Sequence, residues 1–329
     1  MPKKNKPIRV KLIANPGAGN VLEAASRLEQ VTAFLLDYGL KVDVALAKPK
    51  REAIPIAKKA VKNGYDVVIA MGGDGTISAV IRGIAGSKVK LGIIAAGTEN
   101  DIAASLGIPE DLQEACALIA AGHTRKLDLG QVSTKKRKKF YFFMTAAIGL
   151  TATIFPLIKE VPEGKLAGIK DGVMALLKFD TKPTVFLTLD DESKIEVETM
   201  LVTVVNTPLI GAKNLVAPEA SMDDGLLDIA VYPGFSKAGL LNYFIKSAHE
   251  NPTPDGSIQR YRARKIKVKT SPKLDVAAEG ILLGKGTARI KVLPGALRVI
   301  APEPGPGAEK PKDEASKELP EPVSPVTKK

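Results

Sequence analysis

Apolar and polar positions alternate in blocks along the first part of the chain. Apolar runs at residues 8–15, 41–47, 65–73 and 89–97 have the length and composition of buried strands. Leu28, Val31, Leu35 and Tyr38 follow at helical spacing after the first run, and further helices are predicted at residues 56–64, 77–86 and 111–122. Strands separated by helices require crossover connections. The pattern therefore predicts an α/β domain with a parallel sheet over residues 8–127.

Strand-like alternation becomes dominant in the second part of the chain. Hairpins are predicted for residues 124–133 with 139–149 and for 184–190 with 194–206, and further strands at 226–233, 265–270 and 288–302. The clearest helices are expected at residues 163–179 and 237–251. We expect a mostly antiparallel β-sandwich domain over residues 128–300, whose final strand is free to return to the first domain. Residues 1–7 form a basic arm, and residues 301–329, which include seven prolines, are expected to be disordered.

Composition narrows the class of protein. A length of 329 residues suits two domains, and no apolar run approaches the roughly 18 residues of a membrane helix. A single cysteine, Cys116, rules out an intramolecular disulfide, and two histidines make a histidine-built zinc site improbable. The basic N-terminal residues lack the apolar core of a signal peptide. We expect a cytoplasmic protein.

The net charge of +12 is concentrated in two basic clusters. Residues 301–329 carry five lysines and six acidic residues, so residues 1–300 hold the whole excess of +13. The clusters at residues 135–139 and 260–269 suit solvated turns and strand edges, a nucleic acid, or an anionic membrane surface. Tryptophan is absent and aromatic residues make up only 5% of the chain, which disfavours stacking on single-stranded bases. We therefore predict peripheral binding to an anionic membrane and no nucleic-acid partner.

Three glycine-containing loops follow predicted strands, at residues 15–19, 72–76 and 97–101. Ligands of open parallel sheets bind at the carboxyl ends of the strands, so three such loops predict one shared pocket. Neither the P-loop signature nor a GxGxxG motif after the first strand is present. For each loop alone, the alternative is a tight turn in which Asp74, Thr76 or Asn100 merely caps a helix.

The loop GGDGT, followed by AAGTENDIAASLGIP, resembles the diacylglycerol kinase catalytic-domain family, which includes bacterial soluble lipid kinases and sphingosine kinases. The likeness continues through DLGQV, AAIGL, APEASMDDGLLD and LPGALRV, so it covers nearly all of residues 8–300. It implies ATP binding in the cleft between an α/β domain and a β-sandwich domain. The residues implied to line the nucleotide site are Asn15, Gly72, Gly73, Asp74, Gly75, Thr76, Gly97, Thr98 and Asn100.

Magnesium is the second cofactor that the resemblance implies. Asp74 lies among amides expected to bind phosphate, which suits an aspartate that faces Mg²⁺ or its water shell. Alternatively, Asp74 holds the loop through hydrogen bonds to its own amides. The family also places a structural Mg²⁺ in the second domain, which here would be bound by Asp224 with the backbones of Ser221 and Leu226. An ordinary hairpin turn is the alternative for this segment.

The match to the family breaks at the proton acceptor. Aligning the chain without gaps from LPGALR places Glu279-Gly280-Ile281 on the family's Asp-Gly-Glu motif, so isoleucine stands at the acceptor position. Three explanations are open: Glu279 acts instead, although two residues along a strand span about 6.6 Å; transfer is slow; or the protein binds ligands without turnover. Smaller departures from the family pattern occur at Ala47, Ser78, Ala95, Ala212 and Lys213.

The leading hypothesis is an ATP- and Mg²⁺-dependent lipid kinase with Asp74 and Glu279 as catalytic residues. Its acceptor would be the hydroxyl of a diacylglycerol-like or sphingoid lipid, with residues 151–158 and 165–179 as candidate walls of an apolar slot. One alternative is a non-catalytic nucleotide- or lipid-binding pseudokinase. Another is a kinase of a soluble acceptor such as NAD, which APEASMDDGLLD and the positive charge disfavour.

Overall fold

A computed structural model describes residues 8–17, 22–47, 52–150, 183–210, 219–240 and 257–303, together with residues 152, 179, 214, 215, 217, 242 and 243. The helix expected at residues 163–179 and most of the helix expected at 237–251 lie outside the described residues. The same holds for nearly all of the candidate slot walls, for Ala212 and Lys213, and for the N-terminal arm and most of the tail.

The first half is an α/β domain with a parallel sheet, as the sequence predicts. Its strands are β1 (Arg9–Ala14), β2 (Lys41–Leu46), β3 (Val67–Gly72) and β4 (Lys90–Ala95), in the order β2-β1-β3-β4. All six residues of β3 are buried, which matches its uninterrupted apolar run. The chain crosses from β2 to β3 over β1, so a topological switch point lies between β1 and β3.

Helices cover both faces of this sheet. They are α1 (Ala24–Asp37), α2 (Ala53–Lys62), α3 (Asp74–Ile84), α4 (Asp101–Ser105) and α5 (Leu112–Ala121). Helices α1 and α5 share a core with Leu12 and Ile69, whereas α2 and α3 pack against Val68 and Leu91 on the other face. None of the helices in the described ranges is long and apolar enough to cross a membrane.

The second half is built from antiparallel strands that enclose an aliphatic core. The strands are β5 (Thr124–Thr134), β6 (Phe140–Phe142), β7 (Thr145–Gly149), β8 (Thr184–Leu189), β9 (Ser193–Val205), β10 (Leu209–Ile210), β11 (Asn214–Leu215), β12 (Leu227–Pro233), β13 (Gln259–Ala263), β14 (Lys265–Ser271), β15 (Asp275–Ala278), β16 (Ile281–Lys285) and β17 (Ala288–Ile300). The β-sandwich expectation is confirmed.

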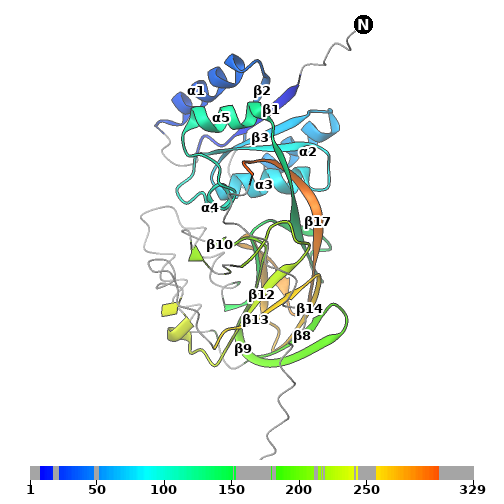
Figure 1. The fold of residues 1–329 in the computed structure, drawn as a ribbon. Helices are drawn as coiled ribbons and strands as arrows, with labels where there is room; N and C mark the ends of the chain where they lie inside the picture. Colours follow the sequence, from blue (N-terminus) through cyan, green and yellow to red (C-terminus); the bar gives the residue numbers. More distant parts are fainter. Residues whose placement is uncertain are drawn as a thin grey trace, which may run out of the picture.

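Two long strands, β5 and β17, join the halves (Figure 1). They pair with each other along most of their length, and the sandwich end of β17 also pairs with β14. At the other end of β17, Arg298 and Val299 pair in parallel with Lys90 and Leu91 of β4. The last strand of the chain therefore completes the first sheet, and one hydrogen-bonded sheet runs from β2 into the sandwich.

Candidate functional site

The three glycine-containing loops meet at the carboxyl ends of β1, β3 and β4. The Asn15 amide Nδ2 donates a hydrogen bond to Thr76 Oγ1 at 3.1 Å, and Asn15 Oδ1 accepts one from the Gly17 backbone amide at 3.0 Å. A side chain at Gly72 would come within 2.7 Å of the same Thr76 oxygen. The hydrogen bond between Asn15 and Thr76 thus joins the first two loops, and a residue larger than glycine at position 72 would collide with Thr76.

The second and third loops touch through their backbones. A Cβ atom added to Gly97 would lie 2.4 Å from the Gly73 Cα atom, which is closer than real atoms approach. Asn100, in the left-handed conformation at φ 56°, accepts a hydrogen bond from the Gly97 amide at 2.9 Å and donates one to the Gly97 carbonyl at 3.0 Å. Asn100 therefore fixes the third loop in the shape that fits against Gly73.

Asp74 links the second loop to helix α4. Its Oδ1 atom accepts the Ile102 amide at 2.8 Å and its Oδ2 atom accepts the Asp101 amide at 3.1 Å. These amides belong to the first turn of α4, where a carboxylate is favoured by unpaired N–H groups and by the helix dipole. Asp74 thus holds a neighbouring segment, so the hydrogen bonds that were one of its two predicted roles go to the amides of α4. The other role, facing Mg²⁺, stays a prediction.

A group of carboxylates around Asp74 is suited to a divalent cation. Oxygen atoms of Asp74, Glu99 and Asp101 all lie within 4.8 Å of one another. Asp101 is almost fully buried and Glu99 is exposed. Carboxylates this close repel one another, and a hard cation with oxygen ligands would relieve the repulsion. The donor set therefore fits Mg²⁺. Glu99 and Asp101 were not singled out from the sequence, although both lie in the quoted TEND segment.

The N-terminus of α3 completes the arrangement. The amides of Thr76 and Ile77 bond to the Gly73 carbonyl at 2.9 and 3.1 Å, and helix geometry directs the amides of Asp74 and Gly75 beyond the helix end. Such an end favours phosphate groups. All nine residues predicted to line the nucleotide site belong to these three interlocked loops; Gly75 and Thr98 are exposed, and Gly72 and Thr76 are buried. Their contact with a nucleotide stays a prediction.

A cavity of about 220 Å³ lies beside the loops, at the switch point between β1 and β3. Asn15 and Arg27 provide polar atoms, while Leu28, Leu46 and Met71 are among the apolar walls. Pockets with apolar walls and a few polar groups are typical of small-ligand sites. Arg27 itself forms an ion pair with Glu23 at 2.6 Å on α1.

Glu279 lies in a different setting from Asp74. Glu279 and Gly280 form the two-residue turn between β15 and β16, with φ angles of 52° and 69°. The Glu279 Oε1 atom accepts the backbone amides of Phe143, Met144 and Thr145 at 3.1, 2.8 and 3.3 Å. These contacts anchor the hairpin to the start of β7. The two predicted catalytic side chains thus have separate hydrogen-bond partners.

Ile281 and Arg82 are the neighbours that bear on Glu279. Ile281 is half-buried and packs against the core of the sandwich. The Arg82 guanidinium stacks on the Phe140 ring, 4.9 Å from its centroid, and its Nε atom donates to the Ser78 carbonyl at 3.2 Å. Burial lowers the pKa of Arg82, and the negative charge of Glu279 opposes that shift. The charges of Arg82 on α3 and Glu279 therefore interact, although their side-chain contacts are with other residues.

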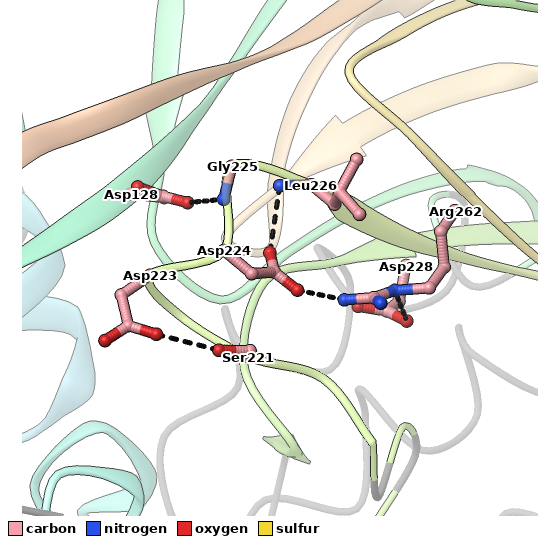
Figure 2. A network of polar contacts seen from close by, with 8 residues as sticks. All are labelled: Asp128, Ser221, Asp223, Asp224, Gly225, Leu226, Asp228 and Arg262. Atoms are coloured by element: carbon pink, nitrogen blue, oxygen red, sulfur yellow. Dashed lines mark hydrogen bonds and ion pairs between the residues drawn. The ribbon is translucent and has the colours of Figure 1, made fainter. Parts of the chain in front are cut away.

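The predicted metal turn of the second domain already contains a cation from the chain (Figure 2). Asp224 Oδ2 pairs with the Arg262 guanidinium, whose Nε atom lies 3.3 Å from Asp228 Oδ1. Asp224 Oδ1 accepts the Leu226 amide at 2.9 Å, and Ser221 Oγ donates to Asp223 Oδ1 at 2.9 Å. Burial raises the pKa of Asp228 to about 6, and Arg262 opposes that rise.

This arrangement does not fit a magnesium ion without displacement of Arg262. Both oxygens of Asp224 have partners, one of them a full positive charge. The ligand set of Asp224 with Ser221 and Leu226 stays a prediction of the family resemblance, and no step of the proposed reaction is assigned to it. Arg262 comes from β13, 38 residues along the chain from Asp224, so sequence spacing gave no signal for the pair.

Asp128 is a buried polar residue beside this turn to which the sequence assigned no role. Its two oxygens accept the amides of Gly225, in the turn before β12, at 2.6 Å and of Gly295, at the irregularity within β17, at 2.7 Å. Burial raises the pKa of Asp128 despite these two hydrogen bonds. An aspartate between two leucines of a buried strand was the signal that could have identified it.

Comparison with known proteins agrees with this architecture. Residues 9–132 match the family model described as diacylglycerol kinase catalytic domain, and residues 159–301 match the one described as YegS C-terminal NAD kinase beta sandwich-like domain. A solved diacylglycerol kinase structure from Bacillus anthracis str. Sterne superposes with a TM-score of 0.68 at 24% identity, over 91% of this chain and 99% of that chain. This structural likeness supports the fold.

Relatives with similar sequences span nearly the same length. A diacylglycerol kinase of Mycobacterium tuberculosis (strain ATCC 25618 / H37Rv) is 30% identical over 306 residues, which are 90% of this chain and 96% of the relative. A diacylglycerol kinase of Bacillus subtilis (strain 168) is 29% identical, covering 83% of this chain and 89% of the relative. The probable lipid kinase YegS of Escherichia coli O127:H6 (strain E2348/69 / EPEC) is 28% identical, covering 84% and 91%. These matches confirm the resemblance read from the glycine loops. The chain therefore belongs to the diacylglycerol kinase catalytic-domain family of lipid kinases.

Proposed function

We propose that this protein transfers the γ-phosphate of ATP to the hydroxyl group of a diacylglycerol-like or sphingoid lipid. The observation that carries the proposal is the interlocked set of loops around Gly73 and Gly97 at the N-terminus of α3. A helix N-terminus with backbone amides exposed between glycines binds phosphate. The neighbouring cavity of about 220 Å³ supports this proposal as the nearest recess for part of the nucleotide.

The chain's own residues position the reactants. Asn15 and Thr76 hold the first loop against the second, and Asp74 holds α4 beside them. Asp74, Glu99 and Asp101 would hold Mg²⁺, which when bound neutralises charge on the transferred phosphoryl group. Phosphoryl transfer needs positioning and charge stabilisation more than covalent help from the protein, so these loops provide most of what the reaction requires.

The lipid hydroxyl must also lose a proton. Ile281 has no group that accepts one, and Glu279 Oε1 is engaged with three amides. General-base catalysis contributes about 10²- to 10⁴-fold, so transfer without it is slow but measurable. Ile281 is the observation that favours the second candidate function, a pseudokinase that binds nucleotide or lipid without turnover. A soluble acceptor such as NAD is not favoured, because the NAD kinase-like description of the sandwich concerns fold alone.

The first experiment is transfer of ³²P from ATP, with Mg²⁺, to lipids in anionic mixed micelles. The panel contains diacylglycerol, monoacylglycerol, ceramide, sphingosine and phosphatidylglycerol, with NAD as the soluble comparison. We expect a labelled lipid. Calorimetry with ATP alone separates the two candidate functions: ATP binding without any labelled product would support the pseudokinase and contradict the kinase.

Two variants assign the roles within the site. Asp74→Asn keeps an acceptor for one α4 amide but removes the charge, so we expect transfer to be lost while the circular dichroism spectrum is unchanged. Unaltered turnover would remove Asp74 from the mechanism. Ile281→Glu restores a carboxylate at the acceptor position, and we expect turnover to rise by about 10²-fold or more.

We further propose a cytoplasmic enzyme that binds membranes peripherally.

A further inference from the structure

The two basic clusters of the sequence come together on one sheet. Residues 265–269 of the second cluster lie on β14, whereas residues 260–263 lie on β13. Strand β14 pairs with β17, and β17 pairs with β5, whose end leads into residues 135–139. Thr134 at the end of β5 lies opposite Ala288 at the start of β17. All five side chains from Lys135 to Lys139 are exposed. Strands β14, β17 and β8 lie side by side in the sandwich half (Figure 1).

One face of this sheet carries a row of cations. We call it the basic sheet face, made of Lys265, Lys267 and Lys269 on β14 with Arg289 and Lys291 on β17. The residues between them, such as Ile266, Val268 and Ile290, are buried in the core of the sandwich. Because side chains alternate across a strand, the five cations all point outward.

Like charges stand directly opposite each other on this face. Lys265 pairs in register with Lys291, and Lys267 pairs in register with Arg289. Opposed residues of antiparallel strands have Cβ atoms about 5 Å apart, and like charges at such positions destabilise the sheet. Within the described residues, Lys265 has a carboxylate partner, Asp191 at 3.1 Å, and no ion pair is recorded for the other four.

The neighbouring strands bring no compensating charge next to the row. Thr188 and Phe186 of β8 lie beside Lys267 and Lys269, and Ser133 and Gln131 of β5 lie beside Arg289 and Lys291. Carboxylates on this side begin one strand further away, at Glu196 and Glu198 of β9. The fold therefore maintains a cluster of like charges that Asp191 compensates at Lys265 and that a bound anion would compensate at the other four positions.

We propose that the basic sheet face and the turn at residues 135–139 dock the protein on an anionic lipid bilayer. The proposal rests on the lipid kinase function, because the acceptor of such an enzyme is embedded in a bilayer. The cations of this face lie on the outer surface of neighbouring strands, so several of them can contact the plane of phosphate headgroups of a bilayer together. Phe186, 38% exposed beside Lys269, can enter the headgroup region. Phe186 is the one aromatic residue opposite the row in the described strand pairings, and a row of four lysines and one arginine with so few aromatic rings is less suited to stacking on nucleic-acid bases.

The test measures vesicle binding of a triple variant, Lys267→Gln with Lys269→Gln and Lys291→Gln. The matched control removes the same charge from exposed positions of α2, through Lys58→Gln with Lys59→Gln and Lys62→Gln. Co-sedimentation uses vesicles of phosphatidylcholine with phosphatidylglycerol, and pure phosphatidylcholine as reference. Each basic residue at an anionic surface strengthens binding about fivefold, so we expect the first variant to bind about 100-fold more weakly and the control to change much less. Binding should also weaken as salt is added.

A second readout separates docking from damage to the fold. Removal of opposed like charges should leave the thermal midpoint of the first variant equal to or above that of the wild type. Equal losses of vesicle binding in the two variants, or unchanged binding in the first, would overturn the proposal. Tighter wild-type binding to duplex DNA than to anionic vesicles at the same salt concentration would also overturn it.

Binding is measured without ATP, so the result is independent of the kinase function. In an active preparation, phosphate transfer to a dispersed short-chain diacylglycerol should be the same in the first variant and the wild type. Transfer to long-chain diacylglycerol in anionic vesicles should fall with binding. Equal loss on both substrates would place these lysines in the active site and overturn a docking role.

Discussion

At the residue scale, Glu279 lies two residues before the position of the family's proton acceptor and has the contacts of a structural anchor. Three backbone amides donate to one of its oxygens, and its own amide donates to the Thr145 carbonyl at 3.0 Å. Hydrogen bonds to a charged acceptor are stronger than neutral ones, and amides left unpaired carry a desolvation cost. The side chain therefore holds the β15–β16 hairpin against β7.

Substitution of Glu279 should test this anchoring role. We expect Glu279→Ala to lower the free energy of unfolding by about 3 kcal/mol, because three amides lose their acceptor. Glu279→Gln keeps an oxygen at the same place and should lose about 1 kcal/mol. Urea unfolding followed by circular dichroism measures both values. Equal stability of the alanine variant and the wild type would contradict the anchoring role.

Arg262 gives the second residue-scale prediction, because it competes with the implied structural metal. Every protein in this test carries Asp74→Asn, which silences the acidic group near the nucleotide loops. If the guanidinium is the resident cation of the Asp224 turn, EDTA and Mg²⁺ should leave the thermal midpoint of this nucleotide-free background protein unchanged. Arg262→Met removes the positive charge between Asp224 and Asp228 while retaining an unbranched stem. Uncompensated carboxylates are costly, so this variant should be less stable by about 3 kcal/mol.

The same variant should acquire a response to metal. With Arg262 gone, Mg²⁺ becomes able to reach the Asp224 oxygens, and millimolar Mg²⁺ should raise its thermal midpoint. Arg264→Met on the exposed side of the same segment is the control, with no change expected from EDTA or Mg²⁺. A thermal midpoint of the Asp74→Asn background protein that falls in EDTA would instead support metal binding by Asp224 with Ser221 and Leu226.

At the element scale, the site depends on two loops that touch where glycine stands in each of them, at Gly73 and Gly97. A Cβ atom on Gly97 would lie 2.4 Å from the Gly73 Cα atom, and one on Gly73 would make a tight contact of 3.1 Å with the Gly97 Cα atom, whereas Gly75 has open space around it. Close packing of loops against each other fixes the end of β3 relative to the end of β4. The geometry of the predicted phosphate site is therefore a property of both loops together.

We expect Gly97→Ala to separate the two loops. A Cβ atom 2.4 Å from the Gly73 Cα atom forces a backbone shift, and overpacking of this kind costs about 1–3 kcal/mol. We expect the affinity for ATP, measured by calorimetry, to fall together with the free energy of unfolding. Gly75→Ala is the matched control, because a Cβ there meets no atom within 4 Å, and its free energy of unfolding should stay within about 0.5 kcal/mol. A Gly97→Ala protein with normal stability and ATP affinity would contradict the predicted role of this contact.

Periodicity predicted the elements well and their long-range contacts poorly. The apolar runs at residues 65–73 and 89–97 became β3 and β4, because fully buried parallel strands leave a local signature. The glycine loops were found for the same reason, since tight backbone positions require glycine. Glu279 on the 143–145 amides and Arg262 on Asp224 left no such trace. Each joins segments that are far apart in sequence and come together only when the sandwich closes.

At the scale of the whole molecule, strand β17 makes the two halves one hydrogen-bonded unit. It pairs with β14 and β5 in the sandwich and with β4 in the parallel sheet. The single cysteine, Cys116, is fully buried in α5 among residues of the first half. Burial raises the pKa of its thiol to about 11. Cys116 therefore reports on the first half, while strand content reports mainly on the second.

We expect thiol labelling and loss of circular dichroism to share one urea midpoint. At pH 8 the folded thiol is buried and protonated, so labelling proceeds through the unfolded chain, where a cysteine pKa of about 8.5 leaves a reactive thiolate fraction. If β17 couples the halves, Cys116 becomes reactive only when the sandwich unfolds as well. Labelling complete at urea concentrations where the circular dichroism signal is intact would show that the first half opens alone.

The pH dependence of stability provides the control on this reporter. The folded thiol keeps its proton up to about pH 11, against a reference pKa of 9.0, so the folded state binds more protons than the unfolded state between these values. The contribution of the buried thiol to the free energy of unfolding is therefore complete below pH 9. It is lost as the pH rises toward 11, by at most about 1.4 kcal/mol per pH unit. Cys116→Ala has no thiol to titrate, so its free energy of unfolding should decline less steeply between pH 9 and pH 11. Identical slopes in the variant and the wild type would mean that the thiol is accessible in the folded protein, and the labelling midpoint would then report local opening of α5.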